Sequence, residues 1–258
     1  MNEKVLKVTF LGTGTSQGIP VIGCTHEVCL SDDLKDKRLR SSVLLEWNNV
    51  KYVIDCGPDF RQQLIRAKVN RLDGILFTHF HADHTAGLDD TRPFTQRYGK
   101  LPIYGKKEVI KNLTKRFDYI FETRNKYYGA PDLGINIIDN RPFKLGGLEV
   151  TPIKVEHGKL NIFGFRILNF AYITDAKRIS TEEKKKFENL DILVVNALRK
   201  EPHPTHFNLQ ESLELITEVK PKKAFLTHIS HRLGFHEVVS KTLPENVFLA
   251  YDGLEIVL

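Results

Sequence analysis

Apolar residues along this chain occur in short runs or alternate with polar ones, and turn-forming or polar residues close each stretch. Stretches of this length and spacing predict β-strands. Two of them are joined by Asn48-Asn49, a pair that favours a hairpin turn. The strands expected from the pattern are residues 5–13, 42–47, 51–55, 74–77, 102–104, 135–139, 148–154, 171–173, 192–196 and 223–227.

Helical spacing and capping residues predict helices between several of these strands. Asn208 and Glu211 match a capping box in front of an apolar face, and Pro221 ends that helix. Other helical segments are expected to begin near residues 60, 86 and 181. The two blocks of strands and helices are not separated by a linker. They therefore predict one layered α/β domain over residues 1–258.

Residues 106–134 are expected to be the least regular part of the chain and to form a lid or an insertion. Aromatic residues alternate there with cations in the segment 117–128 and just before it. Such a segment could stack on a base or sugar while pairing with phosphate. It could equally be a lid packed on its own domain, or the contact surface of a homodimer. The sequence leaves these alternatives open.

Polar residues that bind metals follow the strands. The densest group, His79-Phe80-His81-Ala82-Asp83-His84, comes directly after the apolar run of residues 74–77. His79 and His81 are two residues apart, so in extended backbone they point to the same side. Asp83 and His84 come after the chain has turned and can face a second position. This density of ligands predicts a site for Zn²⁺ or Mn²⁺.

Three later strands are also followed by a metal-binding type of residue. His157, Asp175 and His228 come just past the strands at 148–154, 171–173 and 223–227. In open α/β sheets, ligands and chemistry collect at the carboxyl ends of the strands. We therefore expect these three side chains to lie near one another.

A second group of metal-binding residues lies near the start of the chain, in Cys24-Thr25-His26-Glu27-Val28-Cys29. Three such side chains within six residues suit a closed tetrahedral zinc site whose fourth ligand comes from elsewhere. The alternative is two free thiols near an unrelated histidine. Cys56 is expected to be buried and inert.

Composition and charge restrict the class of protein further. The formal net charge of the 258 residues is +6, which favours an anionic substrate. The basic residues are dispersed, so nucleic acid is compatible with the charge but is not required by it. No apolar stretch approaches the roughly 20 residues of a membrane span, so we expect no membrane partner. An odd number of cysteines, three, argues against a disulfide framework and favours a reducing cytoplasm.

Nearly the whole chain resembles the metallo-β-lactamase-fold hydrolases. The resemblance lies in His79-x-His81-x-Asp83-His84, followed in order by His157, Asp175 and His228. It implies an αββα sandwich with two divalent ions at one edge. By position, His79, His81 and His157 would hold the first ion, Asp83, His84 and His228 the second, and Asp175 would bridge them.

A narrower resemblance is to the PhnP type, the cyclic phosphodiesterases of phosphonate breakdown. It lies in the segment from Gly12 to Pro20, in the cysteine segment after it, and in Leu226-Thr227-His228-Ile229-Ser230-His231. That family has three cysteines in the early segment; here His26 replaces the middle one. The resemblance implies a third, structural zinc held by Cys24, His26, Cys29 and His231.

The reaction expected from this resemblance is hydrolysis of a small or cyclic phosphodiester by a metal-bridging hydroxide. The same resemblance gives His206 a catalytic role beside the metals, and Asp83 belongs to both the metal set and the catalytic set. His203, fixed between Pro202 and Pro204, is a weaker candidate for that role, and by default His203 and His236 are both expected to be surface histidines. The alternatives are an endonuclease resembling ribonuclease Z, a thioester or lactone hydrolase, and a metal-dependent sensor without chemistry.

Overall fold

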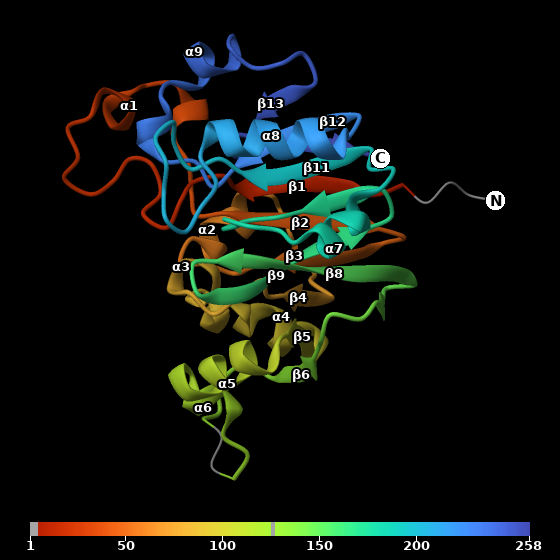
Figure 1. Ribbon diagram of the computed structural model, residues 1–258. Coiled ribbons are helices and arrows are strands. Elements are labelled where there is room, and N and C mark those ends of the chain that lie inside the picture. Colours follow the sequence, from red (N-terminus) through yellow and green to blue (C-terminus); the bar gives the residue numbers. More distant parts are fainter. Residues whose placement is uncertain (1–4, 125–126) are drawn as a thin grey trace.

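Two β-sheets of seven strands each lie at the centre of the computed structural model, which describes residues 5–124 and 127–258 (Figure 1). The first sheet has the strand order β14-β1-β2-β3-β4-β5-β6, and the second has the order β13-β12-β11-β10-β9-β8-β7. The strands of the first sheet are β1 (Lys7–Gly12), β2 (Ser42–Trp47), β3 (Val50–Ile54), β4 (Gly74–Leu76), β5 (Leu101–Gly105), β6 (Leu133–Ile137) and β14 (Glu255–Val257). Those of the second are β7 (Phe143–Leu145), β8 (Leu148–His157), β9 (Leu160–Ile167), β10 (Phe170–Tyr172), β11 (Ile192–Asn196), β12 (Lys223–Thr227) and β13 (Val247–Leu249).

Each sheet is antiparallel in one half and parallel in the other. In the first sheet, β3, β4, β5 and β6 are parallel neighbours. In the second, β10, β11, β12 and β13 are parallel neighbours, whereas β8 and β9 are antiparallel. Parallel neighbours end at the same edge of a sheet, so residues that follow β3 and β4, or β10 and β12, can share one site.

Apolar side chains from both sheets form the central core. Val8, Phe10 and Leu45 of the first sheet are fully buried together with Phe165 and Val194 of the second. The alternation that predicted the strands places one set of side chains in this core and the other set on the outer face of each sheet.

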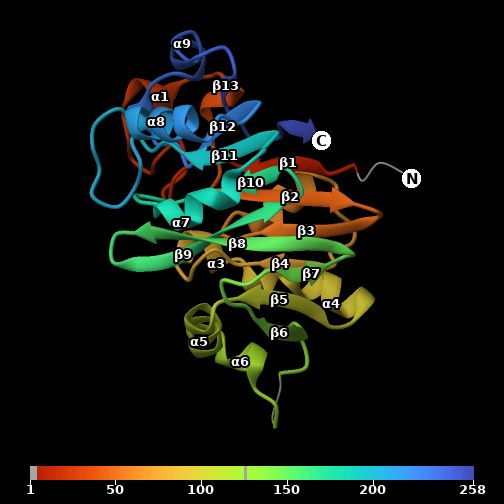
Figure 2. The ribbon, with the colours of Figure 1, turned by 45° about the vertical axis from the view of Figure 1, so that its right-hand side comes forward.

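Helices cover both outer faces, which completes an αββα sandwich and confirms the predicted fold class (Figure 2). Leu64 and Leu113 belong to helices on the first sheet, and Leu215 and Ile216 to a helix on the second. The helices are α1 (Glu27–Leu30), α2 (Phe60–Arg66), α3 (Ala82–Thr85), α4 (Arg92–Tyr98), α5 (Lys107–Arg116), α6 (Asp118–Phe121), α7 (Thr181–Lys184), α8 (Leu209–Val219) and α9 (His236–Ser240). Short 3₁₀ turns occur at η1 (Leu34–Asp36), η2 (Leu88–Thr91), η3 (Lys185–Phe187) and η4 (His231–Leu233).

Local sequence signals account for several element boundaries. Asn48 and Asn49 both have positive φ, as the two-residue hairpin turn between β2 and β3 requires. Asn208 and Glu211 form the predicted capping box of α8. Lys220 ends that helix in the left-handed conformation, just before Pro221.

The segment 106–134 is more regular than its sequence suggested. Residues 107–116 form the helix α5, because Val109, Ile110 and Leu113 pack as one apolar stripe onto the first sheet. Lysines and an arginine within and beside residues 109–113 obscure this stripe in the sequence. Tyr127 and Tyr128 are exposed, and Lys126 lies outside the described residues. In both views α5 and α6 lie at the end of the molecule opposite α1 and α9 (Figures 1 and 2).

Candidate metal centre

The predicted metal-binding residues come together at the carboxyl ends of strands from both sheets. His79 and His81 follow β4, and His157 is the last residue of β8. Asp175 follows β10, and His228 follows β12 directly. The site therefore lies where the two sheets meet, with ligand-type residues contributed by each.

One group of side chains consists of His79, His81 and His157. Their ligand atoms all lie within 4.8 Å of one another. His79 Nε2 lies 2.9 Å from His81 Nδ1, as expected for two side chains on the same side of an extended segment. These are the three residues expected to hold the first ion.

A second group consists of Asp83, Asp175 and His228, again with ligand atoms within 4.8 Å. His84 adjoins it, because its Nε2 atom lies 3.1 Å from Asp83 Oδ2 and 3.4 Å from Asp175 Oδ1. The structure thus brings together the residues expected to hold the second ion.

Asp175 lies between the two groups, and each of its oxygen atoms faces one of them. Its Oδ1 atom is 3.2 Å from His228 Nδ1 and 3.4 Å from His84 Nε2. Its Oδ2 atom is 3.9 Å from His157 Nε2 and 4.0 Å from His79 Nε2. This is the arrangement that a carboxylate bridging two ions requires.

Burial keeps most of these imidazoles in the form that binds metal. Burial and the neighbouring histidines lower the pKa of His79 well below its ordinary value and lower the pKa of His228 to about 4. A neutral imidazole presents a lone pair, which a metal ligand needs. Burial alone would also lower the pKa of His84, but the carboxylates of Asp175 and Asp83 outweigh it and raise that pKa. A cation bound at His84 must therefore displace a proton.

Three residues at the site have the left-handed backbone conformation, which is uncommon outside glycine. The φ angles of Asp55, Asp175 and His228 are 65°, 58° and 53°. Each follows the end of a strand, where the chain turns away from the strand direction. Residues in this region are enriched at functional sites, where surrounding contacts hold them in place.

Asp55, whose role was not predicted from the sequence, holds His84 and Thr78 in place through hydrogen bonds. Its Oδ2 atom accepts hydrogen bonds from His84 Nδ1 at 2.7 Å and Thr78 Oγ1 at 2.8 Å, and its Oδ1 atom accepts from Thr78 N at 2.9 Å. A carboxylate on one nitrogen of an imidazole fixes the ring so that the other nitrogen faces the metal. The signal was available, because Asp55 also follows an apolar strand, β3.

His206 lies at the edge of the centre, on the loop before α8. Its Nε2 atom is 3.1 Å from Asp175 Oδ2, and its ring is stacked on that of His228 with centroids 5.0 Å apart. His203, expected at the surface, is half-buried instead and touches His206, with their Nδ1 atoms 3.1 Å apart. His236 is also buried, and its Nδ1 atom lies 3.1 Å from Arg38 Nη2, away from the metal-binding groups.

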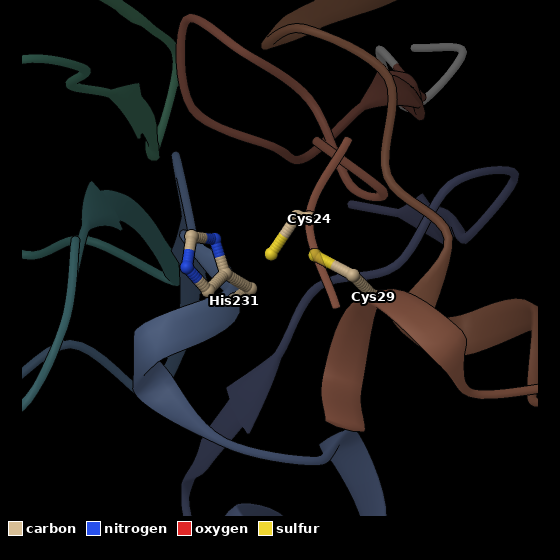
Figure 3. Close-up of side chains that lie close together, drawn as sticks. All are labelled: Cys24, Cys29 and His231. Atoms are coloured by element: carbon tan, nitrogen blue, oxygen red, sulfur yellow. The ribbon is translucent and has the colours of Figure 1, made fainter. Parts of the chain in front are cut away.

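A separate group contains Cys24, Cys29 and His231, with ligand atoms within 4.8 Å (Figure 3). In Figure 3 the sulfur atoms of Cys24 and Cys29 lie next to each other, and both point toward the His231 ring. The backbone N–H of His26 donates to Cys24 Sγ at 3.4 Å. Burial and the nearby Cys24 raise the pKa of the Cys29 thiol. Cys56 is fully buried in the core of the first sheet, as expected of an inert cysteine.

His26 adjoins this group but is not one of its three members. Its Nδ1 atom accepts from Val28 N at 3.2 Å and caps α1, and its ring centroid is 5.0 Å from that of His231. Only its Nε2 atom is left to serve as the fourth ligand. Its predicted role as a zinc ligand stays a prediction.

The donor atoms of both sites fit divalent cations. The main centre offers imidazole nitrogens and carboxylate oxygens, which suit zinc and manganese, and the second offers thiols and an imidazole, which suit zinc. His231 Nδ1 is buried, and within the described part of the chain it has no hydrogen-bond partner. A buried polar atom without a partner is costly, and a bound cation would satisfy it.

Comparison with known families agrees with this geometry. The family model of the β-lactamase superfamily domain matches residues 51–229, a span that contains every residue of the main centre. The chain belongs to the metallo-β-lactamase superfamily. It is a hydrolase of this superfamily, and its groups of histidine and aspartate could hold the divalent ions that the fold implies.

Within the superfamily, the chain is similar to the PhnP family. The crystal structure of a new diphosphatase from that family is 38% identical, covers 98% of this chain and 97% of its own, and superposes with a TM-score of 0.93. An octanoyltransferase of Porphyromonas gingivalis is 36% identical over 98% of this chain, although the chain spans only 52% of that protein's length. A ribonuclease Z of Listeria monocytogenes is 24% identical over 96% of this chain and 97% of its own.

Within residues 5–124 and 127–258, no helix has both the length and the apolar character needed to cross a lipid bilayer.

Proposed function

We propose that the protein is a binuclear metal-dependent phosphodiesterase that acts on a small or cyclic phosphodiester. The observation that carries this proposal is the position of Asp175, whose two oxygen atoms face two separate groups of ligand-type residues. His79, His81 and His157 would hold one ion, and Asp83, His84 and His228 the other. A third ion, zinc, would be held by Cys24, Cys29 and His231, with His26 as the fourth ligand.

When bound, the two ions would supply positive charge for the phosphate oxygens and an activated water, which is the chemistry of two-metal hydrolysis. The residues of the chain hold this arrangement in place. Asp55 fixes the ring of His84, and the carbonyl of Thr205 accepts from His157 Nδ1 at 2.9 Å and fixes that ring in turn. Both rings then present Nε2 to the centre.

His206 is placed to act as a general acid. Its Nε2 atom lies 3.1 Å from Asp175 Oδ2, and because a carboxylate oxygen only accepts hydrogen bonds, Nε2 carries a proton in that contact. The His206 ring also contacts one histidine of each group, with its centroid 4.7 Å from that of His157 and 5.0 Å from that of His228. It could therefore protonate the leaving oxygen of a substrate, a role typically worth about 10²–10⁴-fold in rate.

The net charge and the relatives favour phosphoryl chemistry. The formal charge of +6 attracts an anionic substrate. The PhnP-family diphosphatase and the ribonuclease Z, by their names, both act on phosphate bonds. The octanoyltransferase is named for acyl transfer, but this chain corresponds to only about half of it. Acyl substrates are therefore an outcome to test, not our proposal.

A panel of substrates tests the proposed reaction. The protein, loaded with Mn²⁺ or Zn²⁺, is assayed on bis-p-nitrophenyl phosphate, a cyclic nucleotide, a precursor tRNA and an octanoyl thioester. We expect turnover of the first two. Turnover confined to the precursor tRNA would identify an endonuclease, turnover confined to the thioester would identify an acyl hydrolase, and either result would overturn the proposal.

The His206→Ala variant tests the general acid. Because a p-nitrophenolate leaves without protonation, the variant should lose little activity on bis-p-nitrophenyl phosphate. On the cyclic nucleotide, whose alkoxide needs a proton, kcat should fall by about 10²–10⁴-fold. Equal losses on both substrates would remove the assignment.

A further inference from the structure

His203 and His206 contact each other through their rings on the loop before α8. Their Nδ1 atoms lie 3.1 Å apart, and their ring centroids lie 5.0 Å apart. Thr205 Oγ1 lies beside both, 2.9 Å from His206 Nδ1 and 3.2 Å from His203 Nδ1. The Nδ1 side of the His206 ring, opposite the Nε2 atom that meets Asp175, therefore lies among polar atoms.

The hydrogen bonds around His203 show which nitrogen donates. The backbone N–H of Thr205 points at His203 Nδ1 at 3.4 Å, so this nitrogen is an acceptor. Two nitrogens 3.1 Å apart need one proton between them, and that proton therefore belongs to His206 Nδ1, where His203 Nδ1 and Thr205 Oγ1, 2.9 Å away, both lie in acceptor range. Burial and the adjacent His206 lower the pKa of His203, which keeps its ring neutral and its lone pair available.

The backbone holds His203 where it is. It lies between Pro202 and Pro204, whose rings restrict φ. Arg199 Nη2 donates to the carbonyl of Pro202 at 2.9 Å, and Asn208 Nδ2 donates to the carbonyl of Lys200 at 3.2 Å. His203 Nδ1, the acceptor that contacts His206, therefore lies on a loop that these hydrogen bonds hold in place.

We propose that His203 is a positioning residue, which accepts a hydrogen bond from His206 Nδ1 and so holds the His206 ring with Nε2 directed at the leaving oxygen of the substrate. The proposal rests on the proposed function, in which His206 is the general acid. Within the described part of the chain, the hydrogen bonds and ring contact of His203 are made with Thr205 and His206. It acts through the orientation of one ring.

Substitutions at His203 test this role on the metal-loaded protein, with the cyclic nucleotide and bis-p-nitrophenyl phosphate as substrates. Misplacing a catalytic group by about 1 Å can cost on the order of 100-fold in rate. His203→Ala should therefore lower kcat for the cyclic nucleotide by about 10–100-fold while KM changes less than about twofold. Turnover of the nitrophenyl ester should hardly change. His203→Asn, whose Oδ1 can take the place of Nδ1 as acceptor, should restore most of the loss.

The matched control is Lys200→Ala, which removes an exposed side chain from the same loop and should leave both activities unchanged. A double variant, His203→Ala with His206→Ala, should be no slower than His206→Ala alone, because the two residues act as a unit. Additive losses would contradict the positioning role.

The outcomes separate this inference from the proposed function. If His206→Ala leaves turnover of the cyclic nucleotide unchanged, the general acid is wrong and the inference falls with it. If His206→Ala is slow but His203→Ala is not, the proposed function stands and the inference alone is overturned. Equal losses on both substrates, loss of bound metal, or failure of His203→Asn to restore activity would also overturn it, since each indicates a merely structural role.

Discussion

At the scale of single residues, Asp175 joins the site together. Its Oδ2 atom faces His79 and His157, and its Oδ1 atom faces His228. One carboxylate therefore lies between side chains that follow or end the strands β4, β8 and β12. The sequence could identify the side chains able to bind metal, because their density and their places after strands are visible in it. It could not divide them between two ions. That division came from a family resemblance and stays a prediction, because the groups of ligand atoms that lie within 4.8 Å of one another overlap.

Supporting residues were harder to predict than the ligand types. Asp55 and His203 act through another side chain, His84 and His206 respectively, across 29 residues in the first case and three in the second. A residue of this kind is not part of a motif with a fixed spacing in the sequence. Its role depends on which ring it meets after folding, and only the structure shows that.

Asp55 gives a prediction at this scale. Asp55→Asn keeps the size of the side chain and tolerates the left-handed backbone, but it places an amide group where His84 Nδ1 and Thr78 Oγ1 need an acceptor. Loss of such a partner typically costs about 10–100-fold in metal affinity. We expect a loss of that size, measured by competition with a chelator of known affinity.

The matched control for Asp55→Asn is Asp73→Asn. The Asp73 carboxylate accepts a hydrogen bond from Lys51 N at 2.8 Å, at the other end of the strand pair β3–β4. The Asp73→Asn variant therefore removes a carboxylate beside the same strands but away from the site. Unchanged affinity in Asp55→Asn, or an equal loss in Asp73→Asn, would show that Asp55 does not orient His84.

At the scale of elements, the predicted strands were largely right, and the predicted site depended on where they end. The bounds of β2, β11 and β12 agree with their apolar runs, because each run is closed by turn-forming or polar residues. α5 was missed, because its apolar stripe lies among lysines and arginines. The short edge strands β7, β13 and β14 were also missed, since three residues are too few to show a period, and the longer strand β9 was missed as well.

Two distant elements meet at the group of Cys24, Cys29 and His231. The loop after β1 is already hydrogen-bonded to the segment after β12, by Thr15 N to the carbonyl of Ile229 at 3.0 Å and by Ile229 N to the carbonyl of Thr13 at 2.9 Å. A zinc ion held by Cys24, Cys29 and His231 would add a second link between these two segments. It would thereby stabilise the loop that carries His228.

Cys24→Ser tests this connection. The variant should lose about one bound ion per chain, melt at a lower temperature and keep the two ions of the main centre. Elemental analysis and thermal unfolding provide the measurement. The control is Cys56→Ala, which removes a thiol from the apolar core and should leave the metal content unchanged. If metal content and melting of Cys24→Ser equal those of the unmodified protein, the third site does not exist.

At the scale of the whole molecule, the site depends on both sheets. The first sheet carries the segment from His79 to His84, and the second carries His157, Asp175, His206 and His228. Neither sheet alone holds a complete set for either ion. Apolar side chains between the sheets therefore have a functional consequence, because their packing sets the distance across which the two groups face each other.

The strand order explains why the sequence pattern alone could not give the fold. Apolar runs show where strands occur but not which strands are neighbours, and here β1 pairs with β14 from the far end of the chain. The αββα arrangement was accessible only through resemblance to a family. The site then follows from the fold, because parallel strands bring their carboxyl ends to one edge.

The binuclear centre is the claim on which the remaining proposals depend, and anomalous diffraction from crystals grown with Zn²⁺ tests it most directly. We expect two anomalous peaks, one among His79, His81 and His157 and one among Asp83, His84 and His228, with the Asp175 carboxylate between them. Fewer than two peaks at this position, in crystals shown to contain zinc, would contradict it.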